Sequence, residues 1–165
     1  MNIRKTNIGD LNTVLEIYSV ARKFMRENGN PNQWYNGYPS EEKIVSDITQ
    51  GVSYVVEFNN EVVGVFTFIV GNDATYEIIR GKWLNDKPYG TIHRIASNNK
   101  TKGVMNCCLD FCKSKIDNIK IDTHADNRIM QHLLEKNGFV KCGVIVCDDG
   151  TPRIAYQKDF STDQK

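Results

Sequence analysis

The chain has 165 residues, of which 40% are hydrophobic and 25% are charged. This length favours one compact domain over residues 1–160, followed by a short tail at 161–165. The 21 basic and 20 acidic residues give a formal net charge of +1, so the chain offers no long-range attraction to nucleic acid or to an anionic membrane surface.

The N-terminal residues M-N-I-R-K-T-N-I-G-D lack the apolar core of a signal peptide, and no apolar run approaches a membrane span. The cysteines form no C-x-x-C pair, which argues against a zinc site and predicts no metal. We expect them to be small buried hydrophobic residues of a cytoplasmic protein. They are Cys107, Cys108, Cys112, Cys142 and Cys147.

Met1 to Thr6 is predicted to be a strand, after which Asn7 caps a helix that ends at Gly29. The apolar residues of this helix recur at intervals of three and four. They are Leu11, Val14, Leu15, Tyr18, Ala21 and Met25. Ser40 is predicted to cap a second helix that runs through Gln50.

Between these helices, the segment 29–39 is rich in turn-forming residues yet carries Trp34, Tyr35 and Tyr38. Aromatic side chains in a loop either anchor the loop to the core or line a cleft for a small molecule. We therefore take Trp34 and Tyr38 as candidate walls of a substrate site, with core anchoring as the alternative.

Alternation and the turn residues Asn59-Asn60 predict an antiparallel hairpin of Val52–Phe58 and Glu61–Val70. The irregular segment 71–90 follows, with an expected short extra strand around Tyr76–Ile79. Its aromatic residues Trp83 and Tyr89 are further candidates for the substrate walls. A lid, a dimer contact and simple packing are the alternatives for this segment.

The stretch that begins at Thr91 predicts a strand, a polar loop and a helix in succession. The strand is Thr91–Ser97, the loop is Asn98–Lys102, and Gly103 opens the helix. The free amides at a helix start and the positive end of the helix dipole form a seat for a phosphate group. A surface loop with solvated lysines is the alternative interpretation.

The remaining residues predict a strand at Ile119–His124 and a helix at Asp126–Asn137 that Gly138 closes. A final hairpin pairs Phe139–Val146 with Arg153–Gln157.

The order I-A-S, short loop, K-x-x-G-V, helix, strand and N-x-x-x-x-x-L-L-x-x-N-G-F resembles the acetyl-CoA-binding half of the GCN5-related N-acetyltransferases (GNAT). This resemblance implies an α/β (α+β) fold with a mixed, mainly antiparallel sheet of six to seven strands, flanked by about four helices. It also implies transfer of an acetyl group from acetyl-CoA directly to an amine of a small molecule or peptide, through a ternary complex. A homodimer is left open.

The resemblance further assigns roles to individual residues. It implies that the strand ending at Ala96 splays from its neighbour, so that Ile95 and Ser97 pair with the pantetheine arm and the Ile95 amide serves as the oxyanion donor. Lys100 stands where the family has Arg or Gln. Lys102, Gly103, Val104 and Met105 would present amides to the pyrophosphate, and Asn127 would bond the pantetheine.

His93 is the favoured base, because its position matches the catalytic histidine of the arylalkylamine N-acetyltransferases and imidazole titrates near neutral pH. A structural histidine beside Arg94 is the alternative, and Glu57 and Glu77 are weaker candidates. His124 and His132 are expected to be structural.

The acid that would protonate the departing thiolate is missing from the pattern. Leu134 replaces the tyrosine that the family usually has, which leaves water, Cys147 or Tyr156 as substitutes. This absence favours a second hypothesis, a non-catalytic acyl-CoA sensor or interaction module. A third, an α+β interaction domain without CoA, leaves the Gly103 loop and the Asn127–Phe139 segment unexplained.

Overall fold

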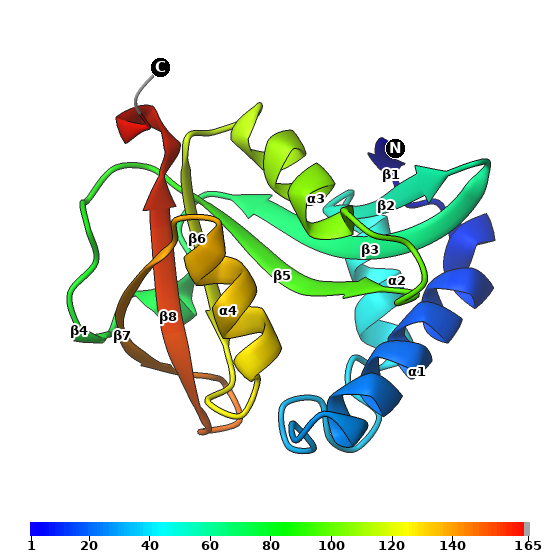
Figure 1. Ribbon diagram of the computed structural model, residues 1–165, viewed down its shortest axis with the longest axis horizontal. Coiled ribbons are helices and arrows are strands. Elements are labelled where there is room, and N and C mark those ends of the chain that lie inside the picture. The colour runs from blue at the N-terminus through cyan, green and yellow to red at the C-terminus, as the bar shows by residue number, and fades with distance from the viewer. Residues whose placement is uncertain (164–165) are drawn as a thin grey trace. The chain divides into compact units, whose positions relative to one another are not determined.

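The computed structural model describes residues 1–163, which divide into two compact units (Figure 1). The first unit comprises Met1–Ile69 and Ile92–Phe111, and the second comprises Val70–Thr91 and the chain from Cys112 onward. The α-helices of the described residues are α1 (Leu11–Glu27), α2 (Glu41–Thr49), α3 (Val104–Lys113) and α4 (Arg128–Lys136). The strands are β1 (Asn2–Lys5), β2 (Ser53–Phe58), β3 (Glu61–Val70), β4 (Arg80–Gly81), β5 (Gly90–Ser97), β6 (Asn118–Thr123), β7 (Val140–Val146) and β8 (Pro152–Asp159).

The strands of residues 1–163 form one mixed sheet in the order β1-β2-β3-β5-β6-β8-β7-β4. The predicted mixed α/β fold with about four helices is confirmed, although the described sheet has eight strands instead of six to seven. β5 runs parallel to β6 and pairs with it through Gly90 and Thr91, whereas β1–β2, β2–β3, β6–β8 and β7–β8 are antiparallel pairs.

The additional strand is β4, which pairs with Val144 and Gly143 of β7. A Cβ atom on Gly81 would collide with the Cys142 carbonyl, so the glycine permits the close approach of the two backbones. A short extra strand is expected around Tyr76–Ile79, but β4 lies directly after that range, because Tyr76 ends the 3-10 helix Ala74–Tyr76. The Asp73 side chain caps that helix by accepting from the Thr75 amide.

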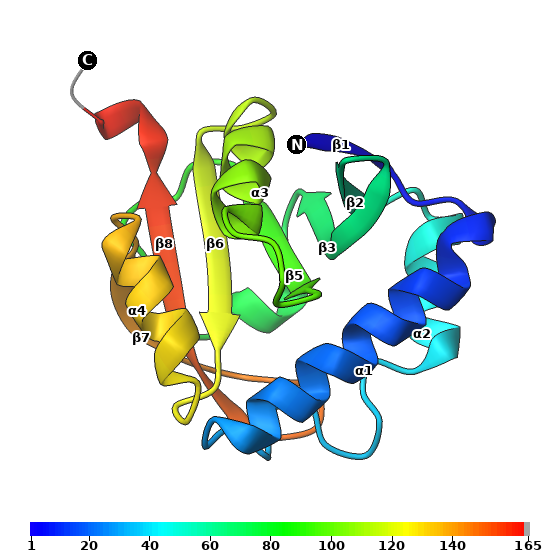
Figure 2. The ribbon, with the colours of Figure 1, turned by 45° about the vertical axis from the view of Figure 1, so that its right-hand side comes forward.

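In the first unit, α1 and α2 lie side by side and cover one face of the strands (Figure 2). Their buried side chains include Val14 and Tyr18 of α1 and Ile44 of α2, which pack with Val55 and Ala96. Ser40 caps α2 as predicted, because its side chain accepts from the Lys43 amide. The prediction that α1 begins directly after Asn7 is wrong, because one turn of 3-10 helix lies between Asn7 and the start of α1 at Leu11.

That intervening turn is the 3-10 helix Ile8–Asp10. The Asp10 carboxylate accepts from the Asn7 amide at 2.8 Å and from Arg4, whose hydrogen bond lowers the pKa of Asp10. The Arg4 guanidinium also donates to Glu57 on β2, which ties this turn to the sheet.

The opposite face of the first unit is covered by residues Val104–Phe111 of α3. Phe111 of α3 lies 4.9 Å from Tyr54 and 6.0 Å from Phe66, measured between ring centroids. Gly64 of β3 allows this close docking, because a Cβ at that position would lie 2.8 Å from a Val104 methyl carbon. The residues around Gly64 therefore fix where α3 begins.

The second unit is built on β6, β8 and β7, with Tyr76, Tyr89, Ile145 and Ala155 buried together. The Asn127 side chain caps α4 by accepting from the Met130 amide at 3.0 Å. Phe160–Thr162 form a 3-10 helix that includes the first two residues of the expected tail at 161–165, and residues 164 and 165 lie outside the described residues.

All five cysteines are free thiols. Cys108 and Cys112 are fully buried, as predicted, whereas Cys107, Cys142 and Cys147 are only half-buried. Within residues 1–163, no helix combines the length and the apolar character needed to cross a membrane.

Candidate active site

The C-terminal end of β5 presents backbone groups on the side away from β3. The Asn98 amide donates to the Val63 carbonyl of β3 at 2.9 Å, and the Ala96 carbonyl lies against Gly64 of the same strand. Because the C=O and N–H of one trans peptide point in opposite directions, both the carbonyl and the amide of Ser97 point away from β3. A ligand with its own donors and acceptors could pair with Ser97 as an added strand would.

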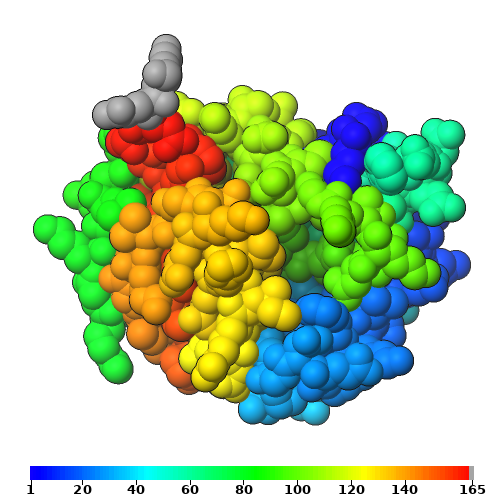
Figure 3. Space-filling view, in the orientation of Figure 1, coloured from blue at the N-terminus to red at the C-terminus, as the bar shows by residue number. Residues whose placement is uncertain are grey.

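The loop after β5 is folded by its own side chains. The Asn98 side-chain oxygen accepts from the amides of Lys100 and Thr101, and the Ser97 hydroxyl accepts from the Asn99 amide. Such local side-chain bonds define the turn without a partner element. The space-filling view shows this yellow-green loop on the surface, where Lys100 and Lys102 are exposed (Figure 3).

Gly103 connects the loop to α3 with a φ of 85°. The first backbone bond of the helix runs from the Cys107 amide to the Gly103 carbonyl, so the amides from Lys102 to Met105 have no carbonyl acceptor within the helix. With the helix dipole behind them and two lysines beside them, these amides suit a dianionic phosphate group. The buried Val104 side chain anchors this end of the helix against Gly64.

Arg94, in the middle of β5, has a φ of 51°. A left-handed conformation in a side-chain-bearing strand residue costs on the order of 1–3 kcal/mol, so other contacts must hold it. The Arg94 guanidinium donates to both carboxylate oxygens of Asp47 on α2, at 2.8 and 3.1 Å. Only 9% of the Arg94 side chain and 6% of the Asp47 side chain are exposed, so water screens this ion pair weakly.

Further contacts surround this pair. Asp47 also accepts from the Thr67 hydroxyl at 2.9 Å, and the Tyr38 hydroxyl accepts from Arg94 at 3.3 Å. Burial lowers the pKa of Arg94, but its hydrogen-bonded neighbours Tyr38 and the negatively charged Asp47 outweigh burial and raise it. The Tyr18 hydroxyl of α1 donates to the Arg94 carbonyl at 2.7 Å, and burial raises the pKa of Tyr18, which therefore stays protonated.

Comparison with solved structures identifies the family. An acetyltransferase of the GNAT family from Streptococcus agalactiae 2603 is 30% identical, with a TM-score of 0.86 over 99% of this chain and 96% of that one. This chain belongs to the GNAT family of acetyltransferases. No protein-family model matches the sequence, and no curated protein matches it.

Other solved structures share the fold over nearly the whole chain. A protein of Staphylococcus aureus Mu50 is 25% identical, with a TM-score of 0.70 over 97% of this chain and 99% of that one. A GNAT-family acetyltransferase of Bacillus cereus ATCC 10987 is 21% identical, with a TM-score of 0.62 over 96% of each chain. The family membership supports acyl transfer as the general activity.

The candidate base His93 is half-buried on β5, next to Arg94. Of the alternative bases, the Glu57 carboxylate forms an ion pair with the Arg4 guanidinium at 2.6 Å, and the Glu77 carboxylate accepts a hydrogen bond from the Asn72 side chain at 2.7 Å. His124 is half-buried and its Nδ1 accepts from the Asp126 amide, whereas His132 is exposed on α4. The segment from His93 to Met105 thus holds the candidate base and most of the predicted CoA contacts within the first unit.

Three of the four predicted substrate walls, Trp34, Trp83 and Tyr89, pack against other side chains. The Trp34 ring packs edge-on against the Tyr18 ring, with 5.6 Å between the ring centroids, which agrees with the alternative that Trp34 anchors its loop to the core. Tyr38, in contrast, is 40% exposed. In the second unit, the Lys120 Nζ atom lies 4.0 Å from the centroid of the Trp83 ring and 3.8 Å from the centroid of the Tyr89 ring. Burial lowers the pKa of Lys120.

The second unit holds the residues that sequence reasoning considered for the acid. Leu134 is fully buried, and the Tyr156 hydroxyl donates to Glu135 at 3.3 Å. Burial raises the pKa of Tyr156 to about 12 and that of Cys147 to about 11. Both groups are weaker acids than an ordinary thiol, whose pKa is about 8.5, so neither readily gives a proton to a thiolate.

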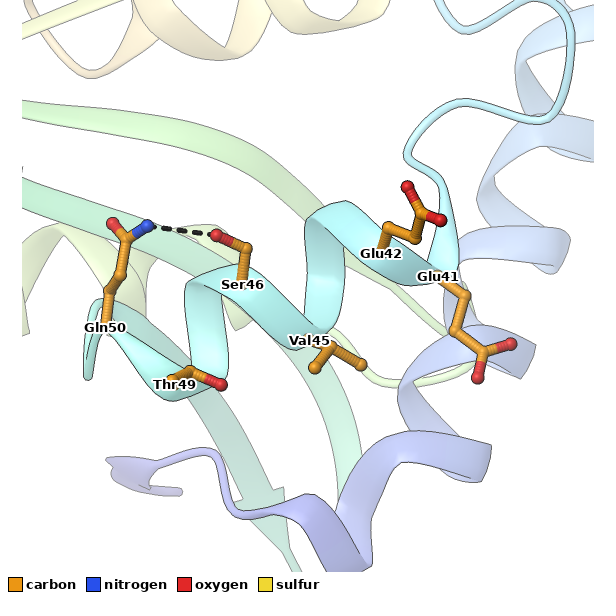
Figure 4. Close-up of a pocket in the computed structure, with 6 residues that line it drawn as sticks. All are labelled: Glu41, Glu42, Val45, Ser46, Thr49 and Gln50. Carbon is orange, nitrogen blue, oxygen red and sulfur yellow. Dashed lines mark hydrogen bonds between the residues drawn. The ribbon is translucent and has the colours of Figure 1, made fainter.

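Figure 4 shows a pocket on the outer face of α2, lined by Glu41, Glu42, Val45, Ser46, Thr49 and Gln50. It contains none of the predicted site residues, and Asp47 lies buried instead of lining it. Across the part of the chain that the structure describes, no group of three or more His, Cys, Asp or Glu side chains could hold a metal ion.

Sequence reasoning missed the contacts of Tyr18, Asp47 and Arg94. Asp47 follows Ile44 by three residues and therefore lies on the apolar face of α2, while Arg94 interrupts an apolar strand. Opposite charges at two positions that should be buried are the signal that could have indicated this pair.

Proposed function

We propose that the chain is an acyl-CoA-dependent N-acetyltransferase that moves the acetyl group of acetyl-CoA directly to an amine of a small molecule or peptide. The observation that carries this proposal is the succession along one segment: the Ser97 backbone groups aimed away from β3, the positive-φ Gly103 and the open amides at the start of α3. The Ser97 backbone groups could pair with the pantetheine arm of CoA, and the amides at the start of α3 could bind its pyrophosphate.

In this proposal the cosubstrate binds chiefly to backbone groups. Ile95 and Ser97 would pair with the pantetheine. Ala96 is a weaker part of the proposal, because its side chain is buried in the core and its carbonyl lies against Gly64 of β3. The amides from Lys102 to Met105 would hold the pyrophosphate, with Lys100 and Lys102 nearby as cations. Asn127 is a weaker part of the proposal, because its side-chain oxygen already caps α4.

The chemistry needs an oxyanion donor, a base and a proton for the thiolate. The Ile95 amide is proposed as the donor and His93 as the base that accepts the amine proton. Since the pKa values of Tyr156 and Cys147 are raised, no side chain is assigned as the acid. The CoA thiolate would leave the site unprotonated and take up its proton from the solvent water.

The lack of a positioned acid favours a second candidate function, an acyl-CoA sensor that does not catalyse transfer. The same backbone site would bind the cofactor in both cases. The two functions differ in turnover, because only the enzyme consumes acetyl-CoA when an amine is added.

The test is thiol release from acetyl-CoA in the presence of amines from separate classes, namely arylalkylamines, polyamines, amino acids, aminoglycosides and peptides. We expect at least one class to raise the release rate well above that with water alone. Saturable binding of acetyl-CoA without release by any class would favour the sensor. Absence of binding would reject both functions.

A further inference from the structure

Arg94 is where β5 departs from the extended conformation. The other described non-glycine residues with a positive φ are all asparagines, which tolerate the left-handed region, whereas Arg94 has no such local preference. The next residue, Ile95, carries the amide proposed to meet the acyl oxygen. The backbone conformation at Arg94 therefore decides where that amide points.

The Arg94 carbonyl and the Ile95 amide belong to the same peptide group and point in opposite directions. The Tyr18 hydroxyl of α1 holds this carbonyl with a hydrogen bond of 2.7 Å. The bond fixes the plane of the peptide, so the Ile95 N–H points away from α1. A hydrogen bond to the carbonyl also polarises the peptide, which makes its N–H a better donor.

The Arg94 side chain is fixed from a second helix. Its two bonds to Asp47 of α2 and the bond from Thr67 to the same carboxylate leave the guanidinium one orientation. Burial raises the pKa of Tyr18, so its hydroxyl remains a donor across the working pH range. The unusual φ of Arg94 is thus held at its carbonyl by α1 and at its guanidinium by α2.

We propose that Tyr18, Arg94 and Asp47 are positioning residues that aim the Ile95 amide at the acyl oxygen of the thioester. This inference rests on the proposed function, because it assigns a purpose to the Ile95 amide in that reaction. None of the three side chains needs to touch the substrate. Their role is to set the direction of one N–H group before the cosubstrate binds.

The test is Tyr18→Phe, which deletes one hydroxyl and retains the ring that packs on Trp34. The probe is an acetyl-CoA analogue in which a methylene replaces the sulfur and the acetyl carbonyl carries ¹³C, observed by infrared difference spectroscopy. We expect the bound carbonyl band of the unsubstituted protein to lie below its solution value and to return toward that value in the variant. The turnover number should fall roughly tenfold to a hundredfold, with the dissociation constant of the analogue changed less than about threefold.

Thr6→Val is the matched control, since it deletes another buried hydroxyl of the first unit, bonded to Ser53 at 2.8 Å. It should leave the carbonyl band in place. A second variant, Asp47→Asn with Arg94→Gly, removes the ion pair without leaving a buried charge, and glycine adopts a positive φ without strain. This double variant should also move the carbonyl band toward its solution value. If Tyr18→Phe does not fold, the carbonyl band of the double variant alone tests the positioning role.

A carbonyl band that is shifted in the unsubstituted protein and unchanged in the folded variants would overturn this inference and leave the proposed function intact. A bound analogue with an unshifted band in the unsubstituted protein would also overturn it, because the Ile95 amide would then not meet the acyl oxygen. Failure of the analogue to bind at all would contradict the proposed function itself.

Discussion

Gly103 joins the polar loop to α3 in a left-handed conformation, and a Cβ atom there would meet nothing closer than a Met1 methyl carbon at 3.7 Å. The glycine is thus required by backbone conformation more than by lack of space. Asparagine tolerates this conformation better than other residues and has nearly the shape of aspartate. These two replacements therefore separate the effect of a side chain from the effect of a charge.

We expect Gly103→Asp to weaken acetyl-CoA binding by at least about tenfold more than Gly103→Asn does. The added carboxylate would lie against the proposed pyrophosphate seat, whereas the amide adds similar bulk without charge. Isothermal titration of both variants measures the difference. Equal dissociation constants for the two would place the pyrophosphate elsewhere.

His93→Gln should lower the turnover number by roughly a hundredfold to ten-thousandfold with little change in acetyl-CoA affinity, since a general base acts on the amine and not on the cofactor. Part of the loss should be recovered at high pH, where the acceptor amine arrives deprotonated. His132→Gln, on the exposed side of α4, is the control. Near-native turnover of His93→Gln at all pH values would exclude His93 as the base.

Among single residues, sequence patterns indicate local roles better than distant partners. The cap at Ser40 and the turn at Asn59-Asn60 follow from residue type and spacing, and the structure contains them. The contact between Asp47 and Arg94 joins residues 47 positions apart, and no local rule selects one partner for a buried charge. The left-handed φ of Arg94 follows from this partner and could not be predicted without it.

At the scale of elements, the placement of α3 depends on the absence of one side chain. Gly64 of β3 faces Val104, the first residue of the helix, and the Ala96 carbonyl lies close by. Aromatic contacts at the other end of the helix, from Phe111 to Tyr54 and Phe66, hold its position. The position of α3 is therefore set by packing near both of its ends.

Gly64→Ala should cost about 1–3 kcal/mol of unfolding free energy and weaken acetyl-CoA binding, because the new methyl group forces the start of α3 away from β3. Adding Val104→Ala should recover part of both losses, since it removes the methyl carbon 2.8 Å from the new Cβ. Chemical denaturation and titration of the four proteins of this cycle measure the coupling. Strict additivity of the two substitutions would contradict the contact.

The order and kind of elements follow from hydrophobic spacing, which is why the helices and the two hairpins could be predicted. The segment 71–90 could not, because its 3-10 helix and two-residue strand are too short for a periodic pattern. Its strand depends on Gly81 meeting Gly143, and that meeting is a property of the folded sheet.

At the scale of the whole molecule, Asp159 links the loop that holds Asn85 and Lys87 to the C-terminal 3-10 helix of the second unit. Its carboxylate accepts from Lys87, Asn85 and Ser161, and the hydrogen bond from Lys87 lowers the pKa of Asp159. A carboxyl group with a lowered pKa in the folded state stabilises the fold above its unfolded pKa, and this contribution is lost as the pH falls through the folded value.

Asp159→Asn should therefore lower the melting temperature at about pH 7, and the difference from the unsubstituted protein should shrink steadily below about pH 4. Asp110→Asn, at an exposed position on α3, is the control and should change little at any pH. A difference that stays constant through the acid range would show that Asp159 does not contribute through its charge.

The most direct test of a backbone site for acetyl-CoA on β5 and α3 is a titration of the ¹⁵N-labelled 18.8 kDa chain with acetyl-CoA, followed through its amide resonances. We predict that the largest shifts occur at Ile95, at Ser97 and from Lys102 to Met105. Shifts confined to the pocket on the outer face of α2, between Glu41 and Gln50, or no shifts at saturating acetyl-CoA, would contradict this site.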